Sequence, residues 1–350
     1  MHAPMSLLEL VDLVKEFPAP AGLLQPRHGV VRAVNHVSLQ VEQRETVGVV
    51  GESGSGKTTL ARLALHLIDP TRGHVRFLGR SLENLSAGEL RALRAHMAII
   101  FQDPYASLNP RQHVDYILGR PFDLHTRLSR REIRRKVLNL LDRVGLSPAV
   151  DFARKFPHQL SGGQRQRVAI GRAVALEPKL IVADEPVSSL DVSVRAQILN
   201  LLRDLQSDLG GSYLFISHDL SVVHSISDRV AVMYEGEIVE EGRAPDVFLN
   251  PAHPYTQLLV ASIPEHLKER RVDFVAGKGD AIGAKDPQGC IFRLRCPYAM
   301  PRCSEAEPPL LNAGEGHSAR CFLLEETLPP ANWVLTRAWT DATGSGEPPV

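Results

Sequence analysis

The sequence lacks the long apolar runs of a membrane-spanning protein. No uninterrupted hydrophobic stretch in its 350 residues approaches the roughly 18–20 residues needed to cross a bilayer. Residues 1–17 carry acidic side chains among the apolar ones and lack the basic-then-apolar layout of a secretion signal. We therefore expect a cytosolic protein, whose association with any membrane must come through a partner.

An excess of charge of one sign is also absent. Forty basic residues balance forty acidic ones, so the net charge gives no reason to expect a nucleic acid partner. The length of 350 residues, with 43% of them hydrophobic, allows one large globular domain and a smaller one.

Cysteine is absent before Cys290, and Cys290, Cys296, Cys303 and Cys321 are spaced C-x5-C-x6-C-x17-C. A cytosolic protein should not hold them as stable disulfides, so their concentration favours a bound metal over scattered structural cysteines. Zinc sites with four cysteines usually contain a C-x(2–4)-C pair, which this sequence lacks. The wider loops suit a larger cluster bound by four thiolates, while zinc and no metal stay open.

A glycine-rich loop is the most informative segment that is present. Residues 51–58 read GESGSGKT and fit the phosphate-loop pattern G-x-x-x-x-G-K-[ST]. Residues 46–50 (TVGVV) predict a buried strand before the loop, and residues 57–68 have helical spacing after it. This strand–loop–helix context argues against a chance glycine loop.

The loop has the chemistry of a nucleotide phosphate site. Its glycines let backbone N–H groups turn toward phosphates, and the helix N-terminus adds a positive dipole end. Lys57 is expected to reach the β- and γ-phosphates, and the Thr58 hydroxyl to bind Mg²⁺. The predicted ATP-binding residues here are Gly51, Glu52, Ser53, Gly54, Ser55, Gly56, Lys57, Thr58 and Thr59.

A second glycine-flanked helix start follows at residues 160–164, LSGGQ. Residues 164–176 have helical periodicity, and Ser161 can cap that helix. Its exposed N-terminal amides would suit the nucleotide of another subunit. A glycine-rich cap without a ligand is the alternative that the residues alone leave open.

Three predicted apolar strands end in polar side chains. Residues 97–102 end at Gln102, residues 179–183 run into Asp184 and Glu185, and residues 213–218 end at His218. The carboxyl edge of an open parallel sheet is where ligands bind. An acid there can hold Mg²⁺ and a second acid can polarise an attacking water.

Phe17 ends a predicted strand region near the N-terminus and could stack on a nucleotide base. From its position alone, a half-buried strand residue is the favoured interpretation.

Seven elements together resemble an ATP-binding cassette (ABC) subunit over roughly residues 7–325. In chain order they are Phe17, GESGSGKT, Gln102, LSGGQ, LIVADE, SSLD and His218. GESGSGKTT, FQDPYASLNPR, ADEPVSSLDVSVRAQILNLL and residues 250–256 (NPAHPYT) are similar to the ATPase subunits of bacterial dipeptide and oligopeptide importers, and also of nickel importers.

The resemblance implies an α/β fold of the P-loop NTPase (ABC ATPase) type. Its nucleotide-binding domain would span residues 1–245, with an antiparallel β subdomain and a helical subdomain at about 103–164. A small Cys-rich C-terminal extension would span 246–325, and 326–350 would be a flexible tail. Some family members carry a [4Fe–4S] cluster in this C-terminal region.

The resemblance also implies a role for each site residue. Phe17 would stack on adenine, and Thr58, Gln102 and Asp184 would bind Mg²⁺. Glu185 would be the general base, helped by Gln102 and by His218 as γ-phosphate switch, and Asp191 would lie at the dimer interface. The residues expected to contact the opposite subunit's ATP are Leu160, Ser161, Gly162, Gly163 and Gln164.

The implied function is ATP hydrolysis that drives the uptake of dipeptides and oligopeptides, or of a related solute. Two ATPase subunits, usually different chains, would sandwich two MgATP and act on two membrane permease subunits. A solute-binding protein would deliver the solute to these permease subunits. The chain would then be peripheral on the cytoplasmic face of the cell membrane. A DNA-repair cassette would need a long coiled-coil insertion or strong basic patches, and the sequence has neither. Intact Glu185 and His218 argue against a non-hydrolysing cassette subunit.

Two departures from the family pattern accompany the resemblance. Arg44 stands where the family usually has glycine before Glu45, and the segment between Phe17 and Val31 is long.

Overall fold

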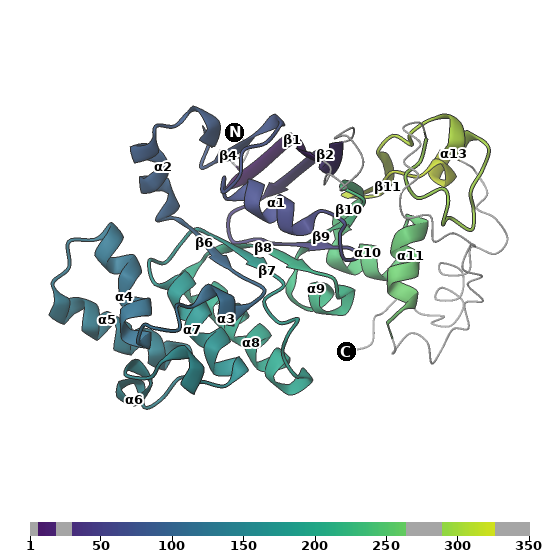
Figure 1. Cartoon of the computed structure of the whole chain (residues 1–350). Coiled ribbons are helices and arrows are strands. Elements are labelled where there is room, and N and C mark those ends of the chain that lie inside the picture. Colours follow the sequence, from purple (N-terminus) through teal and green to yellow (C-terminus); the bar gives the residue numbers. More distant parts are fainter. Residues whose placement is uncertain (1–5, 19–29, 264–288, 326–350) are drawn as a thin grey trace, which may run out of the picture. The chain divides into compact units, whose positions relative to one another are not determined.

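The structure is a computed structural model that describes residues 6–18, 30–263 and 289–325 (Figure 1). The chain divides into two compact units. The first unit comprises residues 1–48 and 58–217, and the second comprises residues 49–57 and 218–350. Residues 19–29 of the long segment between Phe17 and Val31 and the predicted tail 326–350 lie outside the described residues. The predicted domain boundary at 245 stays a prediction.

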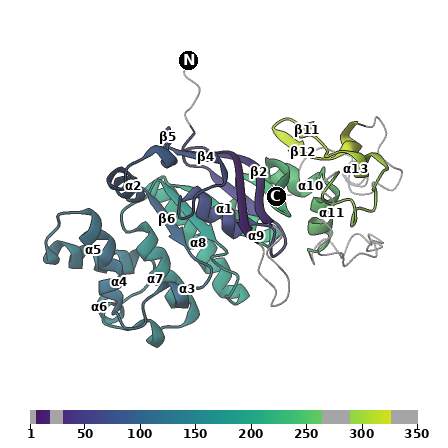
Figure 2. The same cartoon turned by 45° about the horizontal axis from the view of Figure 1, so that its top comes forward.

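An antiparallel sheet forms the N-terminal part of the first unit (Figure 2). Its strands, in the order β2-β1-β4-β5, are β1 (Leu8–Pro18), β2 (Val30–Val41), β4 (Arg72–Phe77) and β5 (Arg80–Ser81). Leu8 pairs with Val41 on one side and Phe77 on the other, and all three side chains are buried. β1 extends to Pro18, so Phe17 is the second-last residue of the strand.

A parallel set of strands forms the centre of the first unit. β6 (Met97–Ile100), β7 (Leu180–Asp184) and β8 (Ser212–Ser217) are parallel neighbours, with β7 in the middle. β3 (Thr46–Val50) follows β8 in the strand order. Every residue of β7 and β8 is buried, as expected for strands covered on both faces. Because the strands are parallel, their carboxyl ends lie at one edge.

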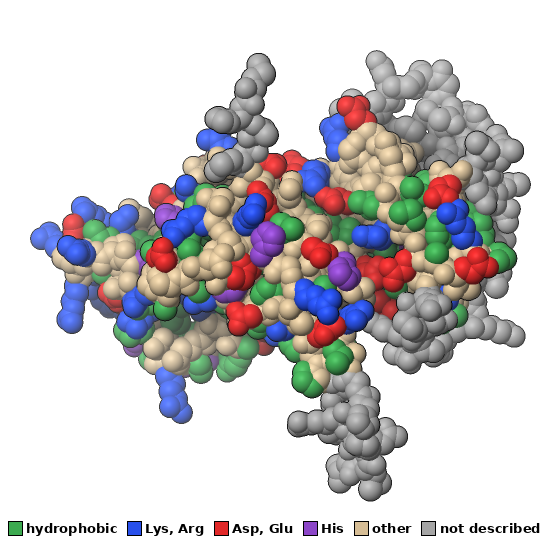
Figure 3. All heavy atoms as spheres, turned by 90° about the horizontal axis from the view of Figure 1, so that it is seen from above, with side chains coloured by type: hydrophobic (Ala, Val, Ile, Leu, Met, Phe, Trp, Pro, Cys, Tyr) green, Lys and Arg blue, Asp and Glu red, His purple; other side chains and the backbone are tan. Residues whose placement is uncertain are grey.

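Helices complete the first unit. Their bounds are α1 (Lys57–Ala64), α2 (Ala87–Arg94), α3 (Pro104–Ser107), α4 (Val114–His125), α5 (Arg130–Arg143), α6 (Ala149–Ala153), α7 (Gly162–Val174) and α8 (Val192–Leu209), with 3₁₀ turns η1 (Leu82–Asn84) and η2 (Pro157–Gln159). On α5, Val137 and Leu141 are buried, while the basic residues of 130–136 are exposed. Figure 3 shows basic side chains over the α4–α5 region. These basic residues therefore form a solvated helix face.

The second unit contains an antiparallel sheet in the order β9-β10-β12-β11. Its strands are β9 (Arg229–Tyr234), β10 (Glu237–Arg243), β11 (Leu311–Gly314) and β12 (His317–Ala319). Its helices are α9 (Leu220–Ile226), α10 (Ala244–Leu249), α11 (Pro254–Ala261), α13 (Arg302–Glu305) and the 3₁₀ turn η3 (Phe322–Glu325). The C-terminal region thus adds strands to β10, which the sequence did not predict.

A buried carboxylate joins the C-terminal strands to the start of α11. Glu240 on β10 has no exposed side-chain surface and accepts the backbone N–H groups of Ala252 and His253, each at 2.8 Å. Its Oε1 also lies 2.7 Å from Nε2 of buried His317 on β12. Burial lowers the pKa of His253 to about 3, so its neutral ring accepts the Tyr255 N–H at Nδ1. Tyr255 is fixed by this network.

The turn before β3 explains why glycine is expected at position 44. Arg44 has φ of 63°, in the left-handed region that glycine adopts without a Cβ penalty. Its backbone N–H donates to Ser212 Oγ at 2.7 Å and so ties this turn to the start of β8.

Candidate functional site

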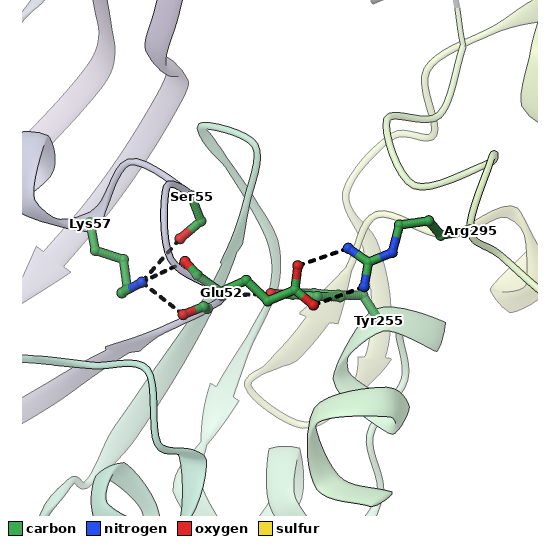
Figure 4. Close-up of polar contacts among 6 residues, drawn as sticks. Glu52, Ser55, Lys57, Tyr255 and Arg295 are labelled. Atoms are coloured by element: carbon green, nitrogen blue, oxygen red, sulfur yellow. Dashed lines mark hydrogen bonds and ion pairs between the residues drawn. The ribbon is translucent and has the colours of Figure 1, made fainter. Parts of the chain in front are cut away.

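The phosphate loop of the second unit is closed by its own lysine (Figure 4). Lys57 is 5% exposed, and its Nζ donates to the carbonyl oxygens of Gly51 and Glu52 at 2.7 and 2.8 Å. A third, longer contact of 3.3 Å joins Nζ to Ser55 Oγ. The ammonium therefore lies inside the loop, bonded to the segment that the sequence predicted would bind phosphate.

Glycine is required at three positions of this loop. A Cβ on Gly51 would lie 2.0 Å from the Met233 carbonyl oxygen, and Gly54 and Gly56 have φ of 84° and 103°. The Ser55 carbonyl accepts the Gly236 N–H at 2.9 Å. The loop is thus a defined conformation held by neighbouring backbone, not a mere glycine-rich connection.

In the first unit, polar groups meet at the carboxyl ends of β6 and β7. Thr58 Oγ1 donates to Asp184 Oδ1 at 3.3 Å, and the Asp184 side chain is buried. Gln102 Nε2 donates to Glu185 Oε2 at 2.9 Å. The hydroxyl, amide and carboxylate groups here are the hard oxygen donors that Mg²⁺ prefers.

Glu185 has a constrained backbone. Its φ is 47°, a left-handed conformation that is uncommon for residues other than glycine and clusters at functional sites. Its N–H donates to the Ile216 carbonyl on β8 at 2.9 Å, and its own carbonyl accepts the Ser188 hydroxyl at 3.1 Å. These bonds hold the residue in this conformation and direct the carboxylate toward Gln102.

The LSGGQ segment forms the capped helix start that the sequence predicted. Ser161 Oγ accepts the Gln164 N–H at 3.2 Å, and the Gln164 side-chain oxygen accepts the Ser161 N–H at 3.0 Å. Ser161 and Gly162 are exposed, while a Cβ on Gly163 would lie 2.7 Å from Val194. The helix therefore begins at an exposed serine and glycine, and the nearby Val194 side chain requires a small residue at position 163.

Three further predicted residues lie at or next to the ends of their own strands and helices. Phe17 is at the end of β1 with 38% of its surface exposed, and the Lys15 ammonium lies 5.2 Å from its ring centroid. His218 directly follows β8, and exposed Asp191 precedes α8 without a side-chain capping bond. Their predicted roles stay predictions.

The four cysteines line one cavity in the second unit, and none forms a disulfide. Burial raises the pKa of Cys296 and Cys321 to about 12 and also raises that of Cys290. Across residues 6–18, 30–263 and 289–325, no three His, Cys, Asp or Glu side chains gather closely enough to hold a metal ion. The thiols therefore share a cavity wall without forming a compact ligand set.

Sequence reasoning missed two residues that contact the phosphate loop. Arg295 forms a bidentate ion pair with Glu52, and the Tyr255 hydroxyl accepts the Glu52 N–H. The chain separations of 243 and 203 residues left no local signal for either contact.

Comparisons with known proteins find related sequences over most of the chain. A family profile described as "ABC transporter" matches residues 34–188, and one described as "Oligopeptide/dipeptide transporter, C-terminal region" matches residues 239–303. The chain is 47% identical over 322 residues to the oligopeptide transport ATP-binding protein AppF of Bacillus subtilis, covering 91% of this chain and 97% of that protein. It is 46% identical over 325 residues to the dipeptide transport ATP-binding protein DppF of Haemophilus influenzae, covering 91% and 97%.

A solved structure supports the fold. A dimeric ATP-binding cassette bound to ADP and phosphate, in a post-hydrolysis state, matches with a TM-score of 0.60 and 30% identity. The match covers 68% of this chain and 98% of the solved one. In the part of the chain that the structure describes, no helix combines the length and apolar character needed to cross a membrane.

Proposed function

The chain belongs to the family of ATP-binding subunits of bacterial oligopeptide and dipeptide ABC importers, and we propose which of its residues bind MgATP and which hydrolyse it. It is an ABC ATPase, in which ATP hydrolysis is coupled to transport. The predicted ABC ATPase fold is confirmed by the match to the solved cassette.

The phosphate loop binds the ATP phosphates in this proposal. The Lys57 ammonium group donates hydrogen bonds to the carbonyl oxygens of Gly51 and Glu52. When ATP binds, it donates to phosphate oxygens instead, because these are charged and therefore stronger acceptors. Thr58 is the next residue after Lys57 in the chain, and its hydroxyl donates to Asp184. Thr58, Asp184 and Gln102 would hold Mg²⁺, which neutralises phosphate charge when bound.

Glu185 is the general base that activates the attacking water. The observation that carries this assignment is the 2.9 Å hydrogen bond from Gln102 Nε2 to the Glu185 carboxylate. The preceding residue, Asp184, accepts the Thr58 hydroxyl. Gln102 orients the carboxylate and leaves the other oxygen lone pairs for a water proton. His218, which follows β8, contacts the γ-phosphate.

Ser161 and the α7 N-terminus act on the ATP of a second subunit. The exposed capped helix start and the dimeric state of the similar solved cassette support this proposal. The partner is a second ABC ATPase chain, and the pair acts on two membrane permease subunits that receive peptides from a solute-binding protein. The complex places this chain on the cytoplasmic face of the membrane.

Isolation of the assembled complex tests this function. We expect the tagged chain to co-purify from solubilised membranes with permease subunits and a second ATPase chain, and to support ATP-dependent uptake of labelled small peptides in vesicles. A Lys57→Ala chain should assemble but lose uptake, because the loop loses its buried cation. Recovery with nucleic acid alone, or ATP binding without hydrolysis, would contradict the proposal.

For the four cysteines we propose a [4Fe–4S] cluster that braces the C-terminal region. Their shared cavity and soft thiolate chemistry support it, and Arg293 in the cavity lining can offset the cluster's negative charge. The buried thiols stay protonated near neutral pH unless a cation stabilises the thiolate form. The described residues contain no compact group of three metal-binding side chains, so this observation favours neither the cluster nor a single zinc ion.

Metal analysis decides between the cluster, zinc and no metal. Anaerobically purified protein is expected to be brown, with about four iron and four sulfide per chain. Cys303→Ser should lower the iron content, while Ser304→Ala, one residue further along α13, should not. Colourless protein that contains one zinc per chain, or four free thiols and no metal, would rule the cluster out.

A further inference from the structure

The phosphate loop is held by residues of the C-terminal region through Glu52. The Arg295 guanidinium donates from Nη1 and Nη2 to the two carboxylate oxygens of Glu52, both at 2.8 Å (Figure 4). Both side chains are partly exposed, so solvent screens the pair, but the bidentate geometry is the strongest arrangement available to it. The hydrogen bond from Arg295 holds the pKa of Glu52 below its usual value.

A second contact holds the backbone of the same residue. The Glu52 N–H donates to the Tyr255 hydroxyl at 2.8 Å, and the Tyr255 ring is fully buried. Burial raises the pKa of Tyr255, so the hydroxyl stays neutral. The Glu240 network at the start of α11 fixes this tyrosine, so the contact is built into the fold.

Arg295 is itself held in place before it reaches the loop. Its guanidinium lies 5.7 Å from the ring centroids of both Tyr234 and Phe292, within cation–π range. Its backbone N–H donates to the Phe292 carbonyl at 3.0 Å. Less side-chain entropy is therefore lost when the ion pair with Glu52 forms.

Glu52 transmits these contacts to the phosphate-binding atoms. Its carbonyl accepts Lys57 Nζ at 2.8 Å and the Ser55 N–H at 3.2 Å. The C-terminal residues therefore hold its side chain and N–H, while the loop's lysine and serine hold its carbonyl. A carboxylate at this loop position would also repel a triphosphate, and the Arg295 charge offsets that repulsion.

We propose that Arg295 and Tyr255 are positioning residues that set the affinity of the phosphate loop for ATP through Glu52. The inference rests on the loop being the ATP phosphate site. If that premise is wrong, the wild-type chain will not bind ATP. If only the positioning role is wrong, wild-type binding will be normal and the variants will match it.

Reversing the ion pair tests the proposal. We expect Arg295→Glu to weaken MgATP binding to the full-length chain by about three- to tenfold, measured with a fluorescent ATP analogue, and Glu52→Arg is made to complete the reversed pair. The double variant with both charges reversed should recover most of the affinity. Arg302→Gln is the matched control, because Arg302 lies in the same region but pairs with Glu325.

Three milder substitutions keep the test decisive if a reversed chain folds poorly. Arg295→Lys should bind ATP more tightly than Arg295→Gln, and Tyr255→Phe should weaken binding by a smaller factor than Arg295→Glu. In the assembled ATPase, KM for ATP should rise while kcat at saturating ATP stays near normal. Unchanged affinity in Arg295→Glu, or an unrecovered double variant with a native thermal unfolding curve, would overturn the proposal.

Discussion

Replacing Glu185 with glutamine is expected to preserve MgATP binding and to lower steady-state hydrolysis by at least about 100-fold. The substituted amide keeps an oxygen that can accept the Gln102 Nε2 hydrogen bond, now 2.9 Å long. The backbone bonds to Ile216 and Ser188 do not involve the side chain and should survive. What is lost is the carboxylate that accepts a proton from water. ATP affinity and phosphate release would be measured on the same preparation.

Glu177→Gln provides the matched control for this experiment. Glu177 also has a left-handed backbone, with φ of 51°, but it is exposed and precedes β7, whereas Glu185 follows the strand. Five strand residues separate the two ends of β7 by about 17 Å. The control should hydrolyse ATP at the normal rate. Near-normal hydrolysis by Glu185→Gln would remove Glu185 from the role of base.

The short buried strands were the most predictable part of the fold. β3 was predicted at its observed bounds, and the predicted bounds of β7 and β8 each differ from the observed ones by one residue. These strands were predictable because short continuous apolar runs are typical of buried strands. Glu185 therefore fell beside Gln102 at the ends of β7 and β6, as predicted. The Ser161 cap was equally readable, since a capping box is a local pattern.

Helix α1 shows where a local pattern was insufficient. The apolar spacing predicted a helix to residue 68, but α1 ends at Ala64. His66 has φ of 49°, and bonds from the His66 and Leu67 N–H groups to the Leu63 and Arg62 carbonyls close the end as a Schellman motif. Glycine usually marks this motif, and histidine gives no such signal.

The C-terminal contacts were beyond sequence reasoning for another reason. β11 and β12 have only four and three residues, and they exist because β12 pairs with β10 about 80 residues earlier. The Glu52–Arg295 pair likewise depends on tertiary structure, because neither residue has a distinctive local pattern. Residues that position the loop were therefore found only in the structure, whereas the loop itself was predicted.

Placing arginine at Ser161 is expected to reduce hydrolysis by at least about tenfold while leaving ATP binding to the same chain unchanged. The reason is that Ser161 lies on exposed surface at the α7 N-terminus, outside the chain's own phosphate loop. A bulky side chain there would separate the helix amides from the opposite subunit's γ-phosphate. Hydrolysis would be measured with the partner ATPase subunit present, and ATP binding with this chain alone.

Loss of the helix cap must be separated from loss of the subunit contact. Ser129→Arg is the matched control, because Ser129 caps α5 with the same capping box and its removal costs a similar stability of about 1 kcal/mol. This control should retain normal hydrolysis. The wild-type specific activity should also rise with protein or partner concentration, because each ATP needs residues from two subunits. Full activity that is independent of concentration in an isolated monomer, or equal losses in both arginine variants, would contradict the two-subunit site.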